Sequence, residues 1–311
     1  MKQDFFGRLS EVVSCGQIKR EELLSRHTTF RIGGPADFFV EVKSAAEAAG
    51  VLALCREEGV PYLLIGSGSN LLVSDRGCRG VVIKFSGELC GAEFEEDGDI
   101  LRARAGAGTP LAQFAREIAA HGGAGFEFAA GIPGSVGGGV YMNAGAYGGE
   151  IRDFLTGARV LSADGALAYK TAEELELGYR SSRLQREEWY VLEAEFAFSR
   201  TEPESIRRKI EELAKMRMQR QPLEYPSAGS TFKRPEGYFA GKLIMETGLA
   251  GLRVGGAEVS EKHCGFLINR GGATAWDVLR LASQVQNAVQ EKFGVVLELE
   301  IRLAGDFGTG N

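Results

Sequence analysis

Glycine is concentrated in short segments that require tight turns and close approaches of the backbone. The chain has 43 glycines among 311 residues, about twice the usual ~7%. Hydrophobic residues make up 44% and charged residues 25%, as in ordinary globular proteins, and no G-X-Y period is present. The excess therefore indicates many structured turns and loops, and it excludes a collagen-like fibre.

Two of these segments have the composition of anion-binding loops. Gly66-Ser67-Gly68-Ser69-Asn70-Leu71 follows an apolar stretch, and a second loop spans 131–138 about 65 residues later. Such loops offer unhindered N–H groups and hydroxyls to a phosphate. Two of them could grip a pyrophosphate, although turns with nothing bound explain the same residues. Neither is a Rossmann fingerprint, and 237–243 falls one residue short of a P-loop.

The apolar periodicity predicts a strand–helix–strand unit near the N-terminus. Residues 38–42 read as a strand, and Ser44 opens a helix that Gly59 ends. A second strand follows at 62–65, so we expect these two strands to form a parallel pair. The other expected elements are strands at 81–85, 189–198 and 295–303, hairpins at 92–105 and 159–169, and helices at 110–121, 206–213 and 275–293.

The order of these elements predicts an α+β protein rather than one doubly wound sheet. A polar segment with a proline at 199–204 is a plausible boundary. We therefore expect a first domain at 1–200, in two lobes of roughly 1–78 and 79–200, and a second at 201–311.

Charge and residue usage disfavour several classes of protein. The net charge of −6 is unlike that of a general nucleic-acid binder. Five widely spaced cysteines without a C-x-x-C, and three histidines without an H-E-x-x-H, disfavour a disulfide scaffold and a metal site. We find no signal peptide and no membrane segment, and expect a cytoplasmic protein.

Seven ordered blocks of the chain resemble the UDP-N-acetylenolpyruvoylglucosamine reductases of peptidoglycan synthesis, in their shorter, second class. The blocks are 27–37, 65–72, 130–138 continuing into 142–148, 178–182, 225–235, 255–260 and 297–302. Three positions depart from common family residues: His27, Arg234 and Leu299.

The resemblance implies a vanillyl-alcohol-oxidase-type FAD-binding domain of two lobes, with a smaller C-terminal α+β domain that binds substrate. It implies non-covalent FAD as cofactor and NADPH as co-substrate. The implied reaction reduces UDP-N-acetylglucosamine enolpyruvate to UDP-N-acetylmuramate. The flavin supplies the hydride chemistry, and the protein stabilises charge and delivers a proton.

Three catalytic residues follow from the family motifs. Arg180 would stabilise charge at the substrate carboxylate, which suits a permanently charged, bidentate guanidinium. Ser230 would donate a proton to the enolic carbanion, with Lys233 nearby to make its hydroxyl more acidic. Glu300 would act at the substrate carboxyl or order Arg180 and a water. Because Glu298 has the same strand parity, only the family match selects Glu300.

The resemblance also implies binding residues. The expected cofactor-binding residues are Gly66, Ser67, Gly68, Ser69, Asn70, Leu71, Gly131, Ile132, Pro133, Gly134, Ser135, Gly138, Asn143, Gly145, Ala146 and Tyr147. The expected substrate-binding residues are Tyr179, Arg220 and Lys233, with Lys215 and Arg217 as further candidates for the diphosphate and Arg302 as a weaker candidate for the flavin.

Two other functions stay open on the residues alone. One is an oxidase or dehydrogenase on the same fold with flavin attached through His27 or His121, although neither lies in an attachment motif. The other is a non-catalytic protein that binds nucleotide sugars. The presence of Arg180, Ser230 and Glu300 disfavours this second function.

Overall fold

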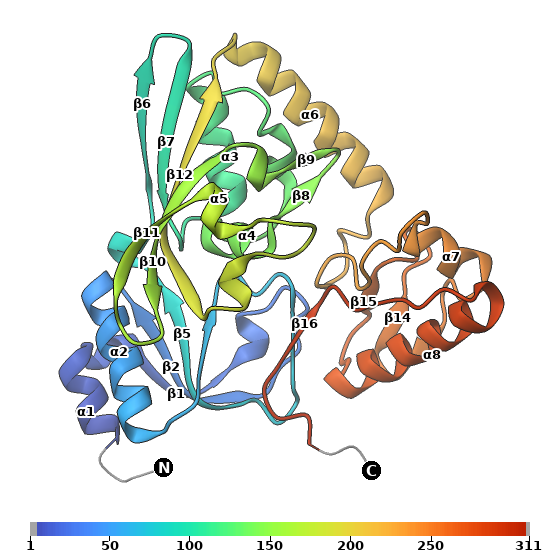
Figure 1. Cartoon of the computed structure of the whole chain (residues 1–311). Helices are drawn as coiled ribbons and strands as arrows, with labels where there is room; N and C mark the ends of the chain where they lie inside the picture. The colour runs from blue at the N-terminus through green and yellow to red at the C-terminus, as the bar shows by residue number, and fades with distance from the viewer. Residues whose placement is uncertain (1–4, 309–311) are drawn as a thin grey trace. The chain divides into compact units, whose positions relative to one another are not determined.

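The computed structural model describes residues 5–308, which pack as two compact units (Figure 1). Unit 1 holds the described residues up to Arg20, then Phe38–Ser67 and Gly80–Met216. Unit 2 holds Glu21–Asp37, Gly68–Arg79 and the described residues from Arg217. Packing thus divides the chain differently from the expected domains 1–200 and 201–311, because two early segments pack with the C-terminal region. The expected assignment of FAD binding to 1–200 and of substrate binding to 201–311 stays a prediction.

A four-stranded sheet contains the strand–helix–strand unit. Its order is β1 (Ile18–Leu23), β2 (Pro35–Val42), β5 (Cys78–Phe85) and β3 (Tyr62–Ile65). Because β5 lies between β2 and β3, the expected direct pairing of β2 with β3 is wrong. The parallel partner of β3 is β5, with Tyr62 opposite Val81.

Helices α1 (Phe5–Val12) and α2 (Ala45–Glu58) belong to the same region of unit 1. The Ser44 hydroxyl accepts the N–H of Glu47 at 3.2 Å, and Gly59 ends α2 in the left-handed conformation with φ +63°. Both ends of α2 were therefore predictable from local residues.

The second sheet of unit 1 is antiparallel, in the order β11-β10-β12-β7-β6. Its strands are β6 (Ala92–Asp97), β7 (Ile100–Gly106), β10 (Leu155–Ser162), β11 (Leu167–Thr171) and β12 (Trp189–Ser199). Both expected hairpins are confirmed by the pairing of β6 with β7 and of β10 with β11. Beneath it, rings of Phe114, Phe126 and Phe196 pack together with centroids 5.2–6.1 Å apart.

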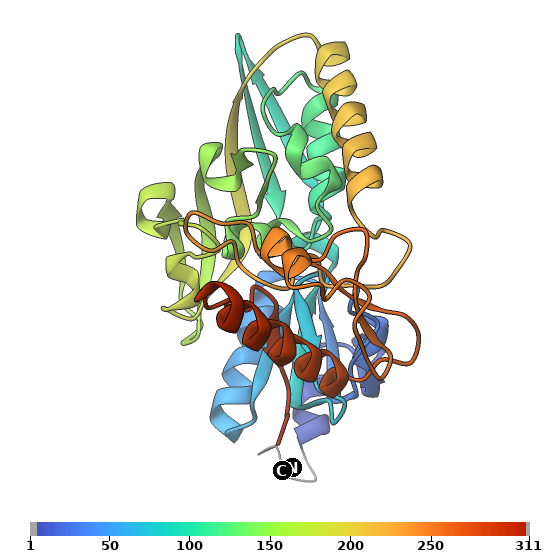
Figure 2. The same cartoon turned by 90° about the vertical axis from the view of Figure 1, so that its right-hand side faces the viewer.

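Unit 2 is built around a small sheet and one long helix. The sheet is β13 (Arg253–Val254), β14 (Ala257–Val259) and β15 (Leu267–Asn269). Helix α8 (Ala275–Phe293) lies beside α7 (Ala240–Glu246), as Figure 2 shows. The Thr274 hydroxyl caps α8 by accepting the N–H of Asp277, and Gly294 ends it, both as expected.

The expected last strand at 295–303 is largely wrong. Only β16 (Arg302–Ala304) is a strand, and it pairs in parallel with β4 (Leu71–Val73). Upstream of it, Leu299 forms an isolated antiparallel bridge with Phe232. Alternating residues predicted a continuous strand, but the segment changes partner between 300 and 302.

The remaining elements are short or connect the others. They are α3 (Leu111–Ala120), α4 (Val136–Met142), α5 (Ala172–Leu175), α6 (Pro203–Arg220), β8 (Gly145–Ala146), β9 (Gly149–Glu150), and the 3-10 turns Cys15–Gln17, Leu24–Arg26, Gly87–Leu89, Glu127–Gly131, Ile151–Asp153 and Arg183–Gln185. Among residues 5–308, no helix is both long and apolar enough to span a membrane.

Candidate functional site

The two glycine-rich loops touch one another within unit 1. A Cβ added to Gly66 would lie 2.3 Å from the Ser135 hydroxyl oxygen, so a larger residue there would displace this hydroxyl. Ser135 is buried, and its hydroxyl accepts the N–H of Gly138 at 3.3 Å at the start of α4. The structure therefore brings Gly66 against Ser135, and the expected shared role of the two loops in cofactor binding stays a prediction.

The rest of the first loop belongs to unit 2. Gly68 has φ +65°, and a Cβ there would lie 2.0 Å from the carbonyl oxygen of His27. The Asn70 side chain donates to the carbonyl oxygen of Glu300 at 3.0 Å, and the Arg302 N–H donates to the Asn70 carbonyl at 2.8 Å. Asn70 thus fixes the backbone beside an expected catalytic residue.

Arg180 lies in a tight turn of unit 1 with unusual backbone geometry. Its φ is +53°, a left-handed conformation that costs energy for a residue with a Cβ. Its guanidinium donates to the carbonyl oxygen of Gly145 at 3.2 Å and lies 5.1 Å from the ring centroid of Tyr179. Tyr147, directly after β8, has φ +53° as well, and its side chain is exposed. Such strained residues concentrate at functional sites.

The side chain of Asn143 is bonded within the protein and is 0% exposed. The expected place of Asn143 among the cofactor-binding residues stays a prediction. Its amide donates to Glu150 and to the carbonyl oxygen of Gly178, and its oxygen accepts the N–H of Arg152. Its polar atoms therefore serve the protein itself.

Ser230 and Glu300 come from segments that are paired in unit 2. Thr231, next to Ser230, is fully buried, and its carbonyl oxygen accepts the N–H of Glu300 at 2.8 Å. The Thr231 N–H donates to Gly265, and its hydroxyl oxygen accepts the N–H of Leu267 at 3.0 Å. One buried residue therefore fixes the backbone of both expected catalytic residues.

The structure distinguishes Glu298 from Glu300, which strand parity could not do. The Glu298 carboxylate is exposed and pairs with the Lys233 ammonium at 2.9 Å. Glu300 is half-buried, and its N–H and carbonyl are both bonded, to Thr231 and Asn70. Lys233 therefore faces Glu298, and its expected effect on the acidity of the Ser230 hydroxyl stays a prediction.

The other expected binding cations lie along α6. Arg220 is exposed in the last turn of α6, in unit 2, and the Arg217 guanidinium donates to Gln221 at 2.9 Å. Lys215 lies in the part of α6 that belongs to unit 1. The expected contacts of Arg220, Arg217 and Lys215 with the substrate diphosphate stay predictions.

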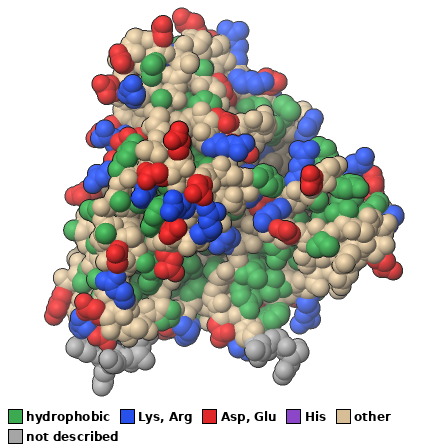
Figure 3. All heavy atoms as spheres, viewed as in Figure 1, with side chains coloured by type: hydrophobic (Ala, Val, Ile, Leu, Met, Phe, Trp, Pro, Cys, Tyr) green, Lys and Arg blue, Asp and Glu red, His purple; other side chains and the backbone are tan. Residues whose placement is uncertain are grey.

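Charges of both signs are interspersed over the face shown in Figure 3. A hollow of about 180 Å³ lies over β6, β7, β10 and β12, away from every expected site residue. Arg104 lies within ion-pair distance of Glu195 there (3.6 Å). In the part of the chain that the structure describes, no group of three or more His, Cys, Asp or Glu side chains could hold a metal ion.

Known protein families match both parts of the chain. Residues 36–168 match the model of an FAD binding domain, and 221–304 match the model described as UDP-N-acetylenolpyruvoylglucosamine reductase, C-terminal domain. A UDP-N-acetylenolpyruvoylglucosamine reductase of Lachnoclostridium phytofermentans is 56% identical over 96% of each chain. The chain belongs to the UDP-N-acetylenolpyruvoylglucosamine reductase family.

Further relatives agree with this membership. A reductase of the same name from Clostridium botulinum is 47% identical over 98% of each chain. The crystal structure of the Thermus caldophilus reductase has a TM-score of 0.78 and 38% identity, covering 92% of this chain and 98% of its own. The expected family, the α+β fold class with an FAD-binding and a C-terminal domain, and the class of FAD-binding oxidoreductases are therefore confirmed.

The loop residues fit FAD. Gly66 lies close to the Ser135 hydroxyl, and the polar groups of the two loops are neutral hydroxyls and backbone amides. Neutral donors of this kind suit a pyrophosphate. The exposed ring of Tyr147 is suited to contact a flat ring system.

Reasoning from the sequence missed the residues that hold the site in place. Thr231 lies inside a family block without a role of its own. Thr29 lies in the first block, and its hydroxyl donates to the Ser227 carbonyl at 2.7 Å. Gln185 lies outside every block and bonds the carbonyl oxygens of Tyr141 and Arg180. Thr231 and Thr29 could have been found from their position in the family blocks 225–235 and 27–37. No sequence signal indicated Gln185.

Proposed function

We propose that this protein reduces UDP-N-acetylglucosamine enolpyruvate to UDP-N-acetylmuramate with NADPH as the reductant. The observation that carries the proposal is the pairing of the Ser230 and Glu300 segments through Thr231. This pairing holds together the two segments that carry Ser230 and Glu300, which the family motifs mark as catalytic. The near full-length identity to reductases of this name supports the choice of substrate.

The reaction adds a hydride and a proton, together two electrons and two protons, across a carbon–carbon double bond. Bound FAD supplies the transfer of a hydride from NADPH to the methylene carbon of the enolpyruvyl group. The electron pair of the double bond then moves onto the neighbouring carbon and its carboxylate. A proton must reach that carbon, so the overall change consumes NADPH and one proton and releases NADP⁺.

Arg180 stabilises the negative charge that develops on the substrate. Its guanidinium is always charged and can bind a carboxylate through two parallel hydrogen bonds. The left-handed backbone at Arg180 supports this role, because strain of this kind survives only where the surroundings hold it. Tyr179, next to it, contributes an exposed ring for contact with substrate.

Ser230 donates its hydroxyl proton to the carbanionic carbon. A serine is a weak acid, but a carbanion is a strong base, so a held hydroxyl suffices. Glu300 acts beside it, at the substrate carboxyl group. Thr231 supports both roles, because a buried and fully bonded residue leaves its neighbours little freedom.

Arg220 and Lys233 are the cations proposed for the substrate diphosphate. Both lie in unit 2 with Ser230 and Glu300. Lys233 is paired with exposed Glu298 at 2.9 Å. Exposed ion pairs contribute little, so an anionic substrate could take over this ammonium at small cost.

Both histidines that a covalent flavin would need have protein partners. His27 Nε2 lies 2.9 Å from Glu22, and the ring of His121 stacks on Phe94 with 4.5 Å between centroids. Non-covalent FAD is therefore the proposed state. Acid precipitation should release free flavin, and flavin retained in the pellet would favour a covalent link.

An anaerobic titration tests the whole proposal. The purified protein should be yellow, lose its visible flavin absorbance on adding NADPH, and regain it on adding the enolpyruvyl substrate. A colourless protein with no FAD affinity after reconstitution would overturn the proposal. So would a reduced protein that the substrate does not reoxidise.

A further inference from the structure

The turn that carries Arg180 is held against the end of α4 by a buried amide. Asn143, the residue after α4, has φ +43° and is 0% exposed. Its side-chain nitrogen donates to the carbonyl oxygen of Gly178 at 2.9 Å and to the Glu150 carboxylate at 3.0 Å. Its side-chain oxygen accepts the N–H of Arg152 at 3.0 Å. A buried amide bonded on both sides fixes its partners strongly, because each lost bond would strand a polar group.

Arg180 is bonded back to the same stretch of chain. Its guanidinium donates to the carbonyl oxygen of Gly145 at 3.2 Å and approaches that of Asn143 at 3.5 Å. Gly145 lies in β8, opposite Glu150 in β9. The backbone carbonyls of Asn143 and Gly145 thus face the Arg180 guanidinium. The side chain of Asn143 also bonds Gly178, which lies two residues before Arg180.

Two further side chains bind the turn from its other end. The Ser182 hydroxyl donates to the carbonyl oxygen of Tyr141 at 2.7 Å. Gln185 donates to the same oxygen at 2.8 Å and to the Arg180 carbonyl at 3.3 Å. One end of the turn is therefore bonded to Asn143 and the other to Tyr141 in α4, all inside unit 1.

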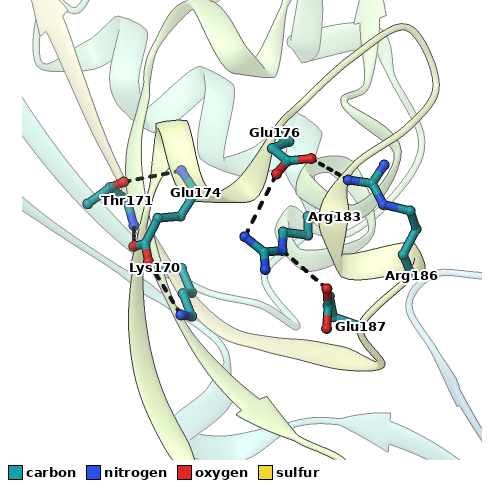
Figure 4. A network of polar contacts seen from close by, with 7 residues as sticks. All are labelled: Lys170, Thr171, Glu174, Glu176, Arg183, Arg186 and Glu187. Carbon is teal, nitrogen blue, oxygen red and sulfur yellow. Dashed lines mark hydrogen bonds and ion pairs between the residues drawn. The ribbon is translucent and has the colours of Figure 1, made fainter.

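An outer set of contacts closes the same loop at the surface. Figure 4 shows Glu176 between Arg183 and Arg186, with Arg183 also reaching Glu187. The Glu176 to Arg183 pair spans 3.7 Å and is exposed on the Glu176 side. Exposed pairs of this kind contribute little, so the buried amide and not this outer network should fix the turn.

We propose that Asn143 is a positioning residue, which acts through Arg180 by holding the turn 178–182 in the geometry that binds the substrate carboxylate. The proposal rests on the proposed function of Arg180. It assigns the side chain of Asn143 to the protein scaffold, although the residue is among the expected cofactor-binding residues. The left-handed backbone of Arg180 is the feature that needs this support, because an unheld arginine would leave that conformation.

The first experiment measures hydrogen exchange and does not depend on the reaction. Asn143→Gly is the main variant, because glycine keeps the left-handed backbone and removes only the amide side chain. Asn143→Asp keeps the shape, removes both donors, and serves if the glycine variant does not fold. Amide exchange in 178–182 should accelerate at least tenfold. Glu176→Gln, the control in the outer network, should stay within twofold of wild type. Exchange at the wild-type rate in both Asn143 variants would overturn the proposal.

The second experiment is a double-mutant cycle on the binding of UDP-N-acetylmuramate, measured by calorimetry on the FAD-loaded protein. Asn143→Gly should weaken binding about tenfold, and combining it with Arg180→Ala should give no more loss than Arg180→Ala alone. Affinity for UDP-N-acetylglucosamine, which lacks the carboxylate, should stay within twofold. Losses that multiply, or an equal loss for both ligands, would show a merely structural role and overturn the proposal.

The two experiments separate this proposal from the proposed function. If wild-type protein binds no UDP-N-acetylmuramate, the proposed function fails, and the exchange rates still decide whether Asn143 holds the turn. If wild type binds it and Asn143→Gly binds equally well, the positioning role fails while the function stands.

Discussion

The backbone N–H of Glu300 donates to the carbonyl oxygen of Thr231, 2.8 Å away. This bond joins two segments about 70 residues apart, one next to Ser230 and one carrying Glu300 itself. Thr231 is 0% exposed. Its N–H donates to Gly265, its hydroxyl oxygen accepts the N–H of Leu267, and its carbonyl accepts the N–H of Glu300. The proton donor and the carboxylate proposed for the reaction are thus built on one buried residue.

Replacing Thr231 with valine should destabilise unit 2. The shapes match, but the N–H of Leu267 loses its acceptor, and an unsatisfied buried donor costs roughly 1–3 kcal/mol. Thr231→Ser keeps the hydroxyl and should lose less. Urea denaturation followed by circular dichroism measures the difference. Equal midpoints for Thr231→Val and wild type would contradict the importance of this bond.

Removing the hydroxyl of Ser230 should separate the two half-reactions. In Ser230→Ala, NADPH should still bleach the flavin at a rate close to wild type, because Ser230 is proposed to act only on the substrate. Reoxidation by the enolpyruvyl substrate should slow about 10²–10⁴-fold, the usual contribution of a positioned acid. Stopped-flow absorbance follows both steps, and Ser227→Ala in the same turn is the control. Unchanged reoxidation would remove Ser230 from the mechanism.

A methyl group on Gly66 should weaken FAD binding. The added Cβ would lie 2.3 Å from the Ser135 hydroxyl oxygen, so either this hydroxyl must rotate away from the N–H of Gly138 or the two loops must move apart. We expect at least a tenfold rise in the dissociation constant for FAD, measured by fluorescence quenching on the apoprotein. Gly16→Ala is the matched control, because nothing lies within 4 Å of its Cβ.

Loss of the Ser135 hydroxyl should partly relieve that clash. In Gly66→Ala with Ser135→Ala the nearest atom is gone, so affinity for FAD should recover in part. A double variant as weak as the sum of both losses would show that the contact is not the cause.

Burial lowers the pKa of His263 below its ordinary value of about 6.5. Its Nδ1 accepts the N–H of Gly265 at 3.1 Å, which requires a neutral ring, and Phe266 packs against the ring. The unfolded chain therefore binds this proton more readily than the folded chain does. The stability contribution is full above about pH 6.5 and is lost as pH falls through the lowered pKa.

The free energy of unfolding should accordingly fall between pH 7.5 and 5.5 by more in wild type than in His263→Asn. Denaturant titrations at several pH values measure this difference, which isolates His263 from the carboxylates that titrate lower. Parallel curves for the two proteins would contradict the depressed pKa.

Local signals predicted most helix ends and hairpins correctly. Ser44, Gly59, Thr274 and Gly294 act on neighbours within a few residues, so their effect on α2 and α8 could be read directly. The hairpins at 92–105 and 159–169 were equally local, because a tight turn sets the pairing on both sides.

Long-range strand neighbours could not be predicted in this way. The placement of β5 between β2 and β3 depends on which strand fills a gap in the sheet. The break at 300–302 depends on two partners, Thr231 and Asn70, that lie far away in the sequence. Residue periodicity reports the face of a strand but not its neighbour.

The sequence by itself determined the glycine loops, the capped helices and, through its ordered motifs, the family, and it supplied Arg180, Ser230 and Glu300 as the candidate catalytic residues. The tertiary structure alone decided how these residues are held. Asn143 and Thr231 act through buried hydrogen bonds to groups 7 to 69 residues away. Burial and non-local pairing exist only after the chain has folded, because no local pattern records which distant carbonyl or N–H will meet a side chain once water is excluded.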